Sequence, residues 1–226
     1  MKKIVLCFVI CSSFFLSKSQ VYLFENFNTG IDTTAGGWTI VNGGNTNDTW
    51  FGTVGGFQGQ YLDGTEFAFV NSDAAGSGPI YLNEELISPT LNTAGAPLLL
   101  LEFDHYFRHV ASTDSGFVDV FDGNNWVGID TFTVSEGTFG APIRRMYDIT
   151  ALANANLAMR FVYDDDTTWA WYWGVDNVRI YTPASLNAAV LGITDPDNNG
   201  REGTSTALST TQNICITLAN VGLDTL

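Results

Sequence analysis

Residues 116–132 read GFVDVFDGNNWVGIDTF, and this stretch decides the fold class. Val118 and Val120 alternate with more polar or aromatic neighbours such as Asp119, the period of two expected for a strand with one buried face. The turn-forming residues 122–125 (DGNN) follow, and an aromatic residue then opens a second alternating run. The stretch therefore predicts an antiparallel β-hairpin.

Short runs of β-branched and aromatic residues recur along the chain, separated by Gly, Thr, Asn and Asp. Long helical patterns are nearly absent, and only 150–156 suggests a single helical turn. The expected strands are 21–27, 37–41, 66–70, 85–88, 98–109, 116–121, 126–132, 144–149, 157–163 and 171–181. So many strands predict an all-β fold in which two antiparallel sheets pack as a sandwich, or jelly roll.

The first residues have the features of an export signal. Lys2 and Lys3 precede an apolar stretch at 4–16, and small residues flank an expected cleavage site before Gln20. Lipidation at Cys11 is a less favoured alternative, because Ile10 is bulky where a lipoprotein signal has a small residue. We therefore expect residues 1–19 to be a signal peptide and the mature protein to be secreted or displayed on the cell surface, without membrane insertion.

The mature chain divides near Thr182-Pro183. Residues 20–183 contain the predicted jelly roll, and residues 184–226 contain two or three further strands, at 186–193 and 213–219, around a polar loop. A sheet that small is not stable alone, so 184–226 is expected to be the incomplete start of a second β-domain. Cys215 is the single cysteine left after the signal and is expected to be a buried structural thiol, with any partner beyond residue 226.

The chain is strongly acidic. It has 24 Asp and Glu against 9 Lys and Arg, a formal charge of −15, and removal of the signal leaves six Arg, no Lys and a charge of about −18. Such a chain is not expected to bind nucleic acid, because contacts to phosphate groups need clustered Lys and Arg side chains. The charge suits cation binding, or a role in which attraction to anionic surfaces is unwanted.

Six short motifs in order carry a family resemblance. They are 24–27 (FENF), Gly37-Trp38 followed by 48–50 (DTW), 67–71 (FAFVN) leading to 86–89 (LISP), 101–107 (LEFDHYF), the hairpin at 117–132, and 171–178 (WYWGVDNV). Over roughly residues 22–182 the chain resembles the MAM-like jelly-roll module of secreted Bacteroidetes proteins, the cleaved-adhesin or choice-of-anchor J family. Residues 187–226 resemble the start of an immunoglobulin-like adhesion module. Family members typically continue to a sorting domain for type IX secretion.

The resemblance implies a calcium ion that joins the first strand to the last. Mapped by motif, its ligands would be Glu25 and Asp176, with Asp48 and Asn47, and with Asn45 as a further oxygen donor. Calcium takes six to eight oxygen ligands, and an unpaired carboxylate inside a strand is costly, which supports a cation. The alternative is that Glu25 and Asp176 face solvent or accept hydrogen bonds from backbone amides.

A group of tryptophans marks the last strand of the jelly roll. Strand alternation would place Trp169, Trp171 and Trp173 on one face and Tyr172 on the other. That row would either pack in the core or lie exposed as a ligand-binding surface for sugar rings or a partner protein.

Other polar motifs have weaker functional interpretations. Residues 164–166 (DDD) are either a solvated turn or a second cation site. His105 and His109 are expected to be structural or surface residues, because no third histidine exists to complete a metal site. Glu84 and Glu85 are expected at a loop edge.

We therefore expect a non-catalytic adhesion or binding module that recognises a glycan or a surface protein and is stabilised by calcium. Catalysis within the chain is not expected, since no nucleophile motif or paired carboxylates stand out. The alternative is the accessory region of a larger exported peptidase or glycoside hydrolase. The ligand and the oligomeric state are not determined by the sequence.

Overall fold

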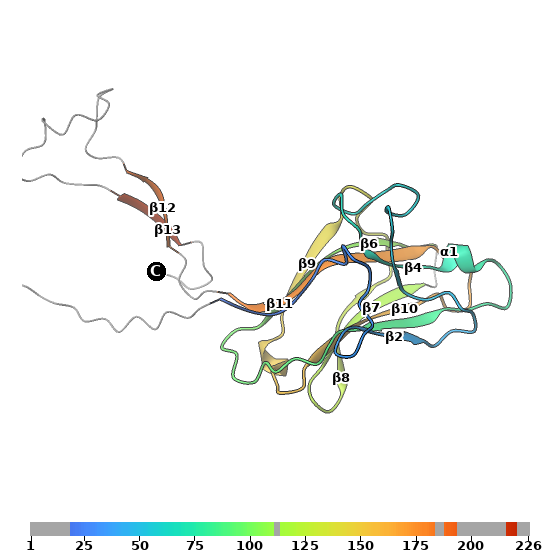
Figure 1. Cartoon of the computed structure of the whole chain (residues 1–226), viewed down its shortest axis with the longest axis horizontal. Coiled ribbons are helices and arrows are strands. Elements are labelled where there is room, and N and C mark those ends of the chain that lie inside the picture. Colours follow the sequence, from blue (N-terminus) through green and yellow to red (C-terminus); the bar gives the residue numbers. More distant parts are fainter. Residues whose placement is uncertain (1–18, 111–113, 184–187, 194–215, 221–226) are drawn as a thin grey trace, which may run out of the picture. The chain divides into compact units, whose positions relative to one another are not determined.

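The computed structural model describes residues 19–110 and 114–183, together with strands β12 (Ala188–Ile193) and β13 (Ile216–Asn220) (Figure 1). The chain divides into two compact units, and one of them is Gln20–Thr182. In the other unit β12 pairs antiparallel with β13. The signal peptide up to residue 18, the polar loop at 194–212 and Cys215 lie outside the described residues, and the immunoglobulin-like assignment stays a prediction.

The unit Gln20–Thr182 consists of two antiparallel sheets, which confirms the predicted all-β sandwich (Figure 1). The six-stranded sheet contains β1 (Gln20–Glu25), β3 (Phe51–Gly52), β4 (Ala68–Asn71), β6 (Leu100–Arg108), β9 (Ile143–Asp148) and β11 (Tyr172–Thr182). The five-stranded sheet contains β2 (Thr39–Asn42), β5 (Asn83–Ile87), β7 (Ser115–Phe121), β8 (Trp126–Phe132) and β10 (Ala158–Asp164). The described helices are α1 (Ser72–Ala75) and a 3-10 turn at Thr150–Leu152.

The predicted strands between residues 21 and 181 are all present, and their ends differ from the observed ones by two residues or fewer. The hairpin predicted at 117–132 forms as expected, from β7 and β8. Val118 and Val120 face the core, and the Asp122 side chain accepts hydrogen bonds from the backbone amides of Asn124 and Asn125, both at 2.8 Å. The prediction omits β3 and α1, which are too short to show a periodic pattern.

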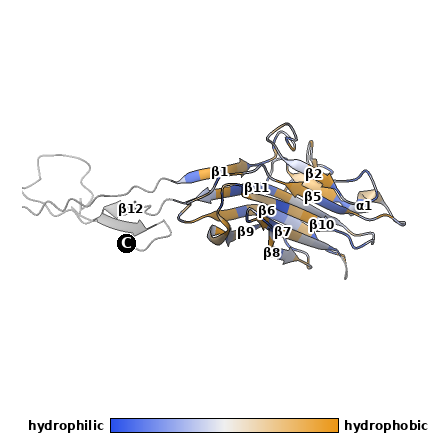
Figure 2. Ribbon diagram, turned by 90° about the horizontal axis from the view of Figure 1, so that it is seen from below, coloured by the Kyte–Doolittle hydropathy of each residue, from blue (hydrophilic) through white to orange (hydrophobic). Residues whose placement is uncertain are grey.

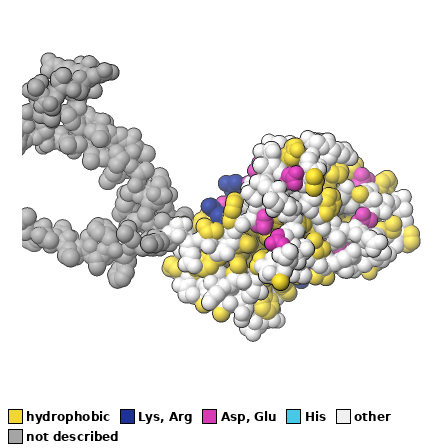
Figure 3. All heavy atoms as spheres, viewed as in Figure 1, with side chains coloured by type: hydrophobic (Ala, Val, Ile, Leu, Met, Phe, Trp, Pro, Cys, Tyr) yellow, Lys and Arg dark blue, Asp and Glu magenta, His cyan; other side chains and the backbone are white. Residues whose placement is uncertain are grey.

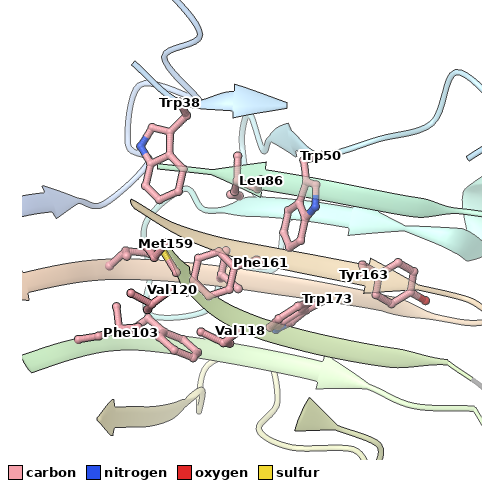
Figure 4. Packing of buried hydrophobic residues seen from close by; sticks show 14 of the residues in the cluster. Trp38, Trp50, Leu86, Phe103, Val118, Val120, Met159, Phe161, Tyr163 and Trp173 are labelled. Carbon is pink, nitrogen blue, oxygen red and sulfur yellow. The ribbon is translucent and has the colours of Figure 1, made fainter. Parts of the chain in front are cut away.

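The main core lies between the two sheets. Along the strands, hydrophilic and hydrophobic residues alternate (Figure 2). Buried apolar residues of both sheets form one cluster, so each sheet turns apolar side chains inward. Figure 4 shows Trp173 and Phe103 from the six-stranded sheet meeting Phe161 from the five-stranded sheet, with Trp50 beside them. The ring centroids of Trp173 lie 5.4 Å from Phe161 and 5.7 Å from Trp50.

A second, smaller apolar cluster covers the outer face of the six-stranded sheet. Its buried members are Leu62, Phe67, Phe69 and Tyr172. Phe57 and Phe139, from the loops before β4 and β9, pack against them. The two loops are joined by a hydrogen bond from the amide of Gly140 to the carbonyl of Tyr61 (2.9 Å). Part of this outer face is therefore roofed by loops, and the candidate functional site lies there.

Strand β11 changes partner and register at its centre. Its first half pairs with β4 and its second half with β1, both along the same edge, while β6 pairs along the other edge. Between the halves, Asn177 has a φ of 51° and the register with β6 shifts by one residue, as in a β-bulge. Because of this bulge, Asp176 and Val178 do not face the same side of the sheet, although strand alternation alone would predict that they do.

Candidate functional site

A pocket of about 320 Å³ opens on the outer face of the six-stranded sheet. We call it the aromatic pocket. Its lining residues are Phe57, Gln58, Gln60, Asp73, Tyr106, Arg108, Thr138, Phe139, Trp171 and Tyr172. This volume lies at the lower end of the range for small-molecule sites, roughly 300–1,000 Å³. It suits a small ligand or the terminal unit of a longer one.

Two central strands supply the floor of the aromatic pocket. Tyr106 and Arg108 are two residues apart in β6 and point outward, since the intervening Phe107 is in the core. Tyr172 of β11 is the cross-strand partner of Arg108. Its hydroxyl lies 3.4 Å from that of Tyr106 and accepts a hydrogen bond from Arg108 Nη1 at 3.1 Å. Burial and this neighbouring hydroxyl raise the pKa of Tyr106 to about 12, so this phenol is a neutral hydrogen-bonding group at physiological pH.

Arg108 is fixed by an aromatic contact as well as by this hydrogen bond. Its guanidinium carbon lies 3.8 Å from the centre of the Trp171 ring, within the range of a cation–π interaction. The hydrogen bond to Tyr172 raises the pKa of Arg108, so the group is charged. One wall of the pocket is therefore a flat cation stacked on an indole ring.

The opposite part of the wall is a tight turn that carries amide side chains. The backbone groups of Phe57 and Gln60 exchange two hydrogen bonds of 2.9 Å, and Gln58 at the tip has a φ of 52°. This turn fixes the backbone at the position of Gln58 and Gln60, whose side chains can both donate and accept hydrogen bonds. Aromatic surface next to such groups suits a ligand with apolar faces and hydroxyl edges.

The three tryptophans predicted to share one face do not share it. Trp173 is fully buried in the main core. Trp171 precedes the first residue of β11 and packs on the outer cluster. Trp169 is 56% exposed and donates a hydrogen bond to the carbonyl of Asp73 at 3.2 Å, next to the aromatic pocket. Trp169 and Trp171 precede β11, so the alternation of side chains along a strand does not hold for them.

A second polar region lies further along the same strands, and we call it the carboxylate junction. It consists of Asp63, Thr65, Asp104, Asp176 and Asn177. The Asn177 side-chain amide donates to Asp63 Oδ2 at 2.9 Å and to Asp104 Oδ2 at 3.0 Å. Asp104 also accepts two hydrogen bonds from Arg144, at 2.8 and 2.9 Å. The junction thus ties the loop before β4 to strands β6, β9 and β11.

Asp176 is the fully buried member of the carboxylate junction. Burial, reinforced by the negative charges of Asp63 and Asp104, raises its pKa to about 7. Burial also acts on Asp63, but hydrogen bonds from Thr65 and Asn177 outweigh it and lower the pKa of Asp63. The Thr65 hydroxyl donates to Asp63 at 2.5 Å and lies 3.5 Å from Asp176 Oδ2. Asp176 is consequently the junction carboxyl that most readily keeps its proton.

Glu25 lies on the other face of the sheet from Asp176. It is the cross-strand partner of Val178, a core residue, whereas Asp176 is the partner of Asp104 on the outer face. Its carboxylate accepts hydrogen bonds from the amide of Phe27 at 2.8 Å and from Trp38 Nε1 at 3.3 Å. The bulge at Asn177 separates the two carboxylates that the resemblance implied as joint ligands.

Asp48 and Asn47 lie at the opposite end of β4 from the carboxylate junction. They line a small pocket together with Asn71, the last residue of β4. Asp176 lies beyond the other end, since its neighbour Val175 is the partner of Ala68. Asn45 contacts the loop before β5 instead, donating to the Pro79 carbonyl at 2.7 Å. The structure does not bring the implied calcium ligands together, and within the described residues no group of three or more His, Cys, Asp or Glu is arranged to hold a metal ion.

The remaining polar motifs have local structural roles. Asp165, in the middle of the 164–166 run, is buried and accepts hydrogen bonds from the amide of Leu82 and from the Ser72 hydroxyl. His105 is fully buried, and burial lowers its pKa to about 4. His109 Nδ1 lies 2.7 Å from Asp114 Oδ1. Glu84 is fully buried rather than at a loop edge.

Of the pocket residues, Trp171 is predicted from the sequence as a ligand-binding residue. Tyr172 is predicted on the opposite face, but both residues line the aromatic pocket. Arg108 and Tyr106 were missed, although a signal existed. They are two residues apart in a run whose intervening positions are apolar, so an outward-facing pair was predictable. Phe57 and Phe139 come from long loops, and their position over the sheet has no sequence signature.

The fold is shared with known structures. The K3 and K1 cleaved adhesin domains of Lys-gingipain from Porphyromonas gingivalis W83 match with TM-scores of 0.52 and 0.53 and with 14% and 17% identity, over 73% and 72% of this chain and 99% and 97% of theirs. A carbohydrate-binding module, TmCBM61 in complex with β-1,4-galactotriose, matches with a TM-score of 0.50 and 11% identity, over 72% of this chain and 99% of its own.

These likenesses establish an adhesin-type jelly-roll fold for the unit Gln20–Thr182. At such low identity they do not establish a ligand. No protein-family model matches the chain, and no curated protein matches it. Within the described residues no helix is long and apolar enough to cross a membrane.

Proposed function

We propose that Gln20–Thr182 is a non-catalytic glycan-binding module of an exported or cell-surface protein, and that the aromatic pocket receives the sugar. The observation that carries the proposal is the composition of the pocket. Trp171, Tyr106 and Phe57 offer aromatic surface, while Arg108 and Gln60 offer hydrogen bonds. Sugar rings combine apolar faces with hydroxyl edges, and binding sites commonly join aromatic walls to a few polar groups.

Two further points support binding rather than catalysis. Asp73 is the single carboxylate among the pocket-lining residues that the structure describes, whereas glycoside hydrolysis ordinarily uses two. The jelly-roll fold is also that of a module crystallised with a galactose trisaccharide. A surface protein as the ligand is the other outcome that the test must separate.

The test compares two tryptophan variants of the mature chain on a panel of immobilised glycans. Trp171→Ala removes the aromatic wall of the pocket, and we expect an affinity loss of about 30-fold or more, as for a binding hot spot. Trp126→Ala is the matched control, because Trp126 lies on the five-stranded sheet beside Arg160. It should bind like the parent protein. Absence of glycan binding by the parent, or equal losses in both variants, contradicts the proposal.

Calcium stabilisation and the choice-of-anchor J assignment stay predictions from the resemblance, as does type IX secretion. The implied ligand set Glu25, Asp48, Asn47 and Asp176 does not fit one ion, and we derive no function through it. Calcium stabilisation is tested by melting the mature chain with added calcium and with a chelator. An identical melting temperature in both removes calcium from the account.

A further inference from the structure

Arg108 differs from the other arginines of the jelly-roll unit in forming no salt bridge to a carboxylate among the described residues; Asp73 acts on it only at longer range. Residues 20–182 contain five arginines. Four of them form salt bridges to carboxylates at 2.9 Å or less; they are Arg144, Arg145, Arg160 and Arg179. No such bridge involves Arg108 within the part of the chain that the structure describes. In a protein with 24 acids and 9 bases, an arginine without a salt bridge is the exception.

The environment of Arg108 holds its charge toward the aromatic pocket. The Trp171 ring covers one face of the guanidinium, and a single donor is used by Tyr172. A guanidinium has five N–H donors in a fixed plane, so several remain for a ligand. Arg pairs preferentially with planar carboxylates through two parallel hydrogen bonds, and this preference is lost with Lys.

Asp73 restricts which anion can bind. It lines the same pocket and is exposed, but forms no salt bridge with Arg108. A bare anion would meet its repulsion, whereas a sugar hydroxyl would donate a hydrogen bond to it. A ligand with both a carboxylate and ring hydroxyls satisfies Arg108 and Asp73 together. A neutral sugar satisfies Asp73 but brings no carboxylate into direct hydrogen bonds with the guanidinium.

We infer that the aromatic pocket selects an acidic sugar, a uronate whose carboxylate pairs with Arg108 while its ring lies against the aromatic wall. This inference rests on the proposed glycan-binding function. The net negative charge of the module does not prevent such a contact, because its repulsion is largely screened beyond about 8 Å in physiological salt. Figure 3 shows Asp and Glu side chains spread over one face of this unit, with Lys or Arg side chains mainly at its left edge.

The experiment measures binding of the mature chain to oligogalacturonate, oligoguluronate and oligoglucuronate, each paired with its carboxyl-reduced neutral counterpart. At least one acidic oligosaccharide should bind about 10- to 100-fold more tightly than its reduced form, as expected for a charge-assisted bidentate contact. Polyglutamate, which has carboxylates without sugar rings, should not bind.

Three variants locate the effect. Arg108→Gln should abolish the preference for the acidic form, so that the affinities for the acidic and the reduced oligosaccharide become about equal. Arg108→Lys should retain only part of it, since the planar fork is lost. Arg179→Gln is the matched control: it removes a positive charge elsewhere, and its partner Glu102 keeps a hydrogen bond from the Tyr181 hydroxyl at 2.9 Å. It should leave the preference intact.

The outcomes separate the two proposals. Equal binding of acidic and reduced oligosaccharides, with loss of both in Trp171→Ala, overturns the uronate inference and leaves the glycan-binding function standing. A preference that survives Arg108→Gln also overturns the inference. If no glycan binds at all, acidic or neutral, both proposals are wrong. The ratio of the two affinities is the decisive readout, because a purely structural role of Arg108 would lower both affinities together.

Discussion

The outer face of the six-stranded sheet carries two polar regions built from the same segments, β6, β11 and the loop before β4, and their charged groups are used differently. In the carboxylate junction, each carboxylate has hydrogen-bond partners within the protein, and Asn177 joins Asp63 to Asp104. In the aromatic pocket, Arg108 and Asp73 lie in one cavity without forming a salt bridge. Groups that satisfy each other stabilise a fold, and groups left open are available to a ligand. We therefore expect substitutions in the junction to change stability, and substitutions in the pocket to change binding.

The largest effect is expected from Asn177→Ala. The substitution removes the donor shared by Asp63 and Asp104 and places a side chain other than Asn or Gly at a φ of 51°. Urea unfolding should show a loss of about 2–4 kcal/mol, from hydrogen bonds to charged groups and from backbone strain. Affinity for glycan should stay within about twofold.

Asn177→Gly is the control for this variant. Glycine adopts the positive φ without steric cost but also lacks the amide, so the difference between the two variants measures the backbone contribution, about 1–2 kcal/mol. A stable Asn177→Ala protein that has lost glycan binding would reverse the assignment of the two regions.

The pH dependence of stability tests the carboxylate junction without any substitution. Asp176 has its pKa raised from 3.8 to about 7 in the folded protein, so between about pH 4 and pH 7 the folded state keeps a proton that the unfolded chain has lost. Stability must then fall as the pH rises through this range. Burial raises the pKa of Glu84, Asp114 and Asp165 in the same direction. His105 acts in the opposite direction, because burial lowers its pKa from 6.5 to about 4. We expect the four carboxyl groups to outweigh it, so the melting temperature should be higher at pH 5.5 than at pH 8.

Asp176→Asn isolates the contribution of that carboxyl. The amide has nearly the same shape and carries no charge, so in the presence of chelator the variant should melt about 3 °C or more above the parent at pH 8 and near it at pH 5.5. If Asp176 binds calcium after all, added calcium should raise the melting temperature of the parent and not that of the variant. A difference in melting temperature between variant and parent that is the same at pH 8 and at pH 5.5 contradicts the assigned protonation of Asp176.

Tyr172→Phe should have a smaller effect, confined to the aromatic pocket. It removes the hydroxyl that holds Arg108 and keeps the aromatic ring. We expect a destabilisation of about 0.5–1.5 kcal/mol and a several-fold loss of affinity for acidic oligosaccharides, measured by unfolding and by calorimetry. Tyr181→Phe is the matched control, since the hydroxyl that it removes donates to Glu102 at 2.9 Å and lies outside the aromatic pocket. Equal losses in the two variants would show that Tyr172 does not position the guanidinium.

Asp48→Asn should have the smallest effect. Asp48 is exposed and lies at the far end of β4 from the carboxylate junction. The melting temperature of the Asp48→Asn variant should stay within about 2 °C of that of the parent, with or without calcium. A calcium-dependent stabilisation that disappears in this variant would restore the ligand set implied by the resemblance and place the ion near Asn47.

The arrangement of strands was predictable because hydrophobic alternation and turn residues are local properties. The hairpin at 115–132 shows this best. Its buried valines, its Asp122-capped turn and its return strand all follow from neighbouring residues. The face on which Asp176 lies was not predictable in the same way, since one bulge at Asn177 reverses the alternation.

The residues of the aromatic pocket show the same difference between what local pattern predicts and what long-range contacts decide. A ligand-binding role for Trp171 stays a prediction. Its expected alignment with Trp169 and Trp173 on one face is wrong, because β11 begins only at Tyr172. The roof of the pocket depends on loops whose contacts join residues more than 80 positions apart, such as Phe57 and Phe139, with ring centroids 6.1 Å apart. Long-range contacts of this kind leave no periodic trace in the sequence.

By itself, therefore, the sequence determined an acidic, all-β chain with a two-sheet core, since burying alternating apolar residues requires a second sheet. Only the tertiary structure decided which polar groups meet. It placed Glu25 and Asp176 on opposite faces of a sheet, gathered Asp63, Asp104 and Asp176 around one asparagine, and stacked Arg108 on a tryptophan without a salt bridge. The physical reason is that strand formation depends on the chain's local pattern, whereas the pairing of charges depends on register, bulges and loop closure.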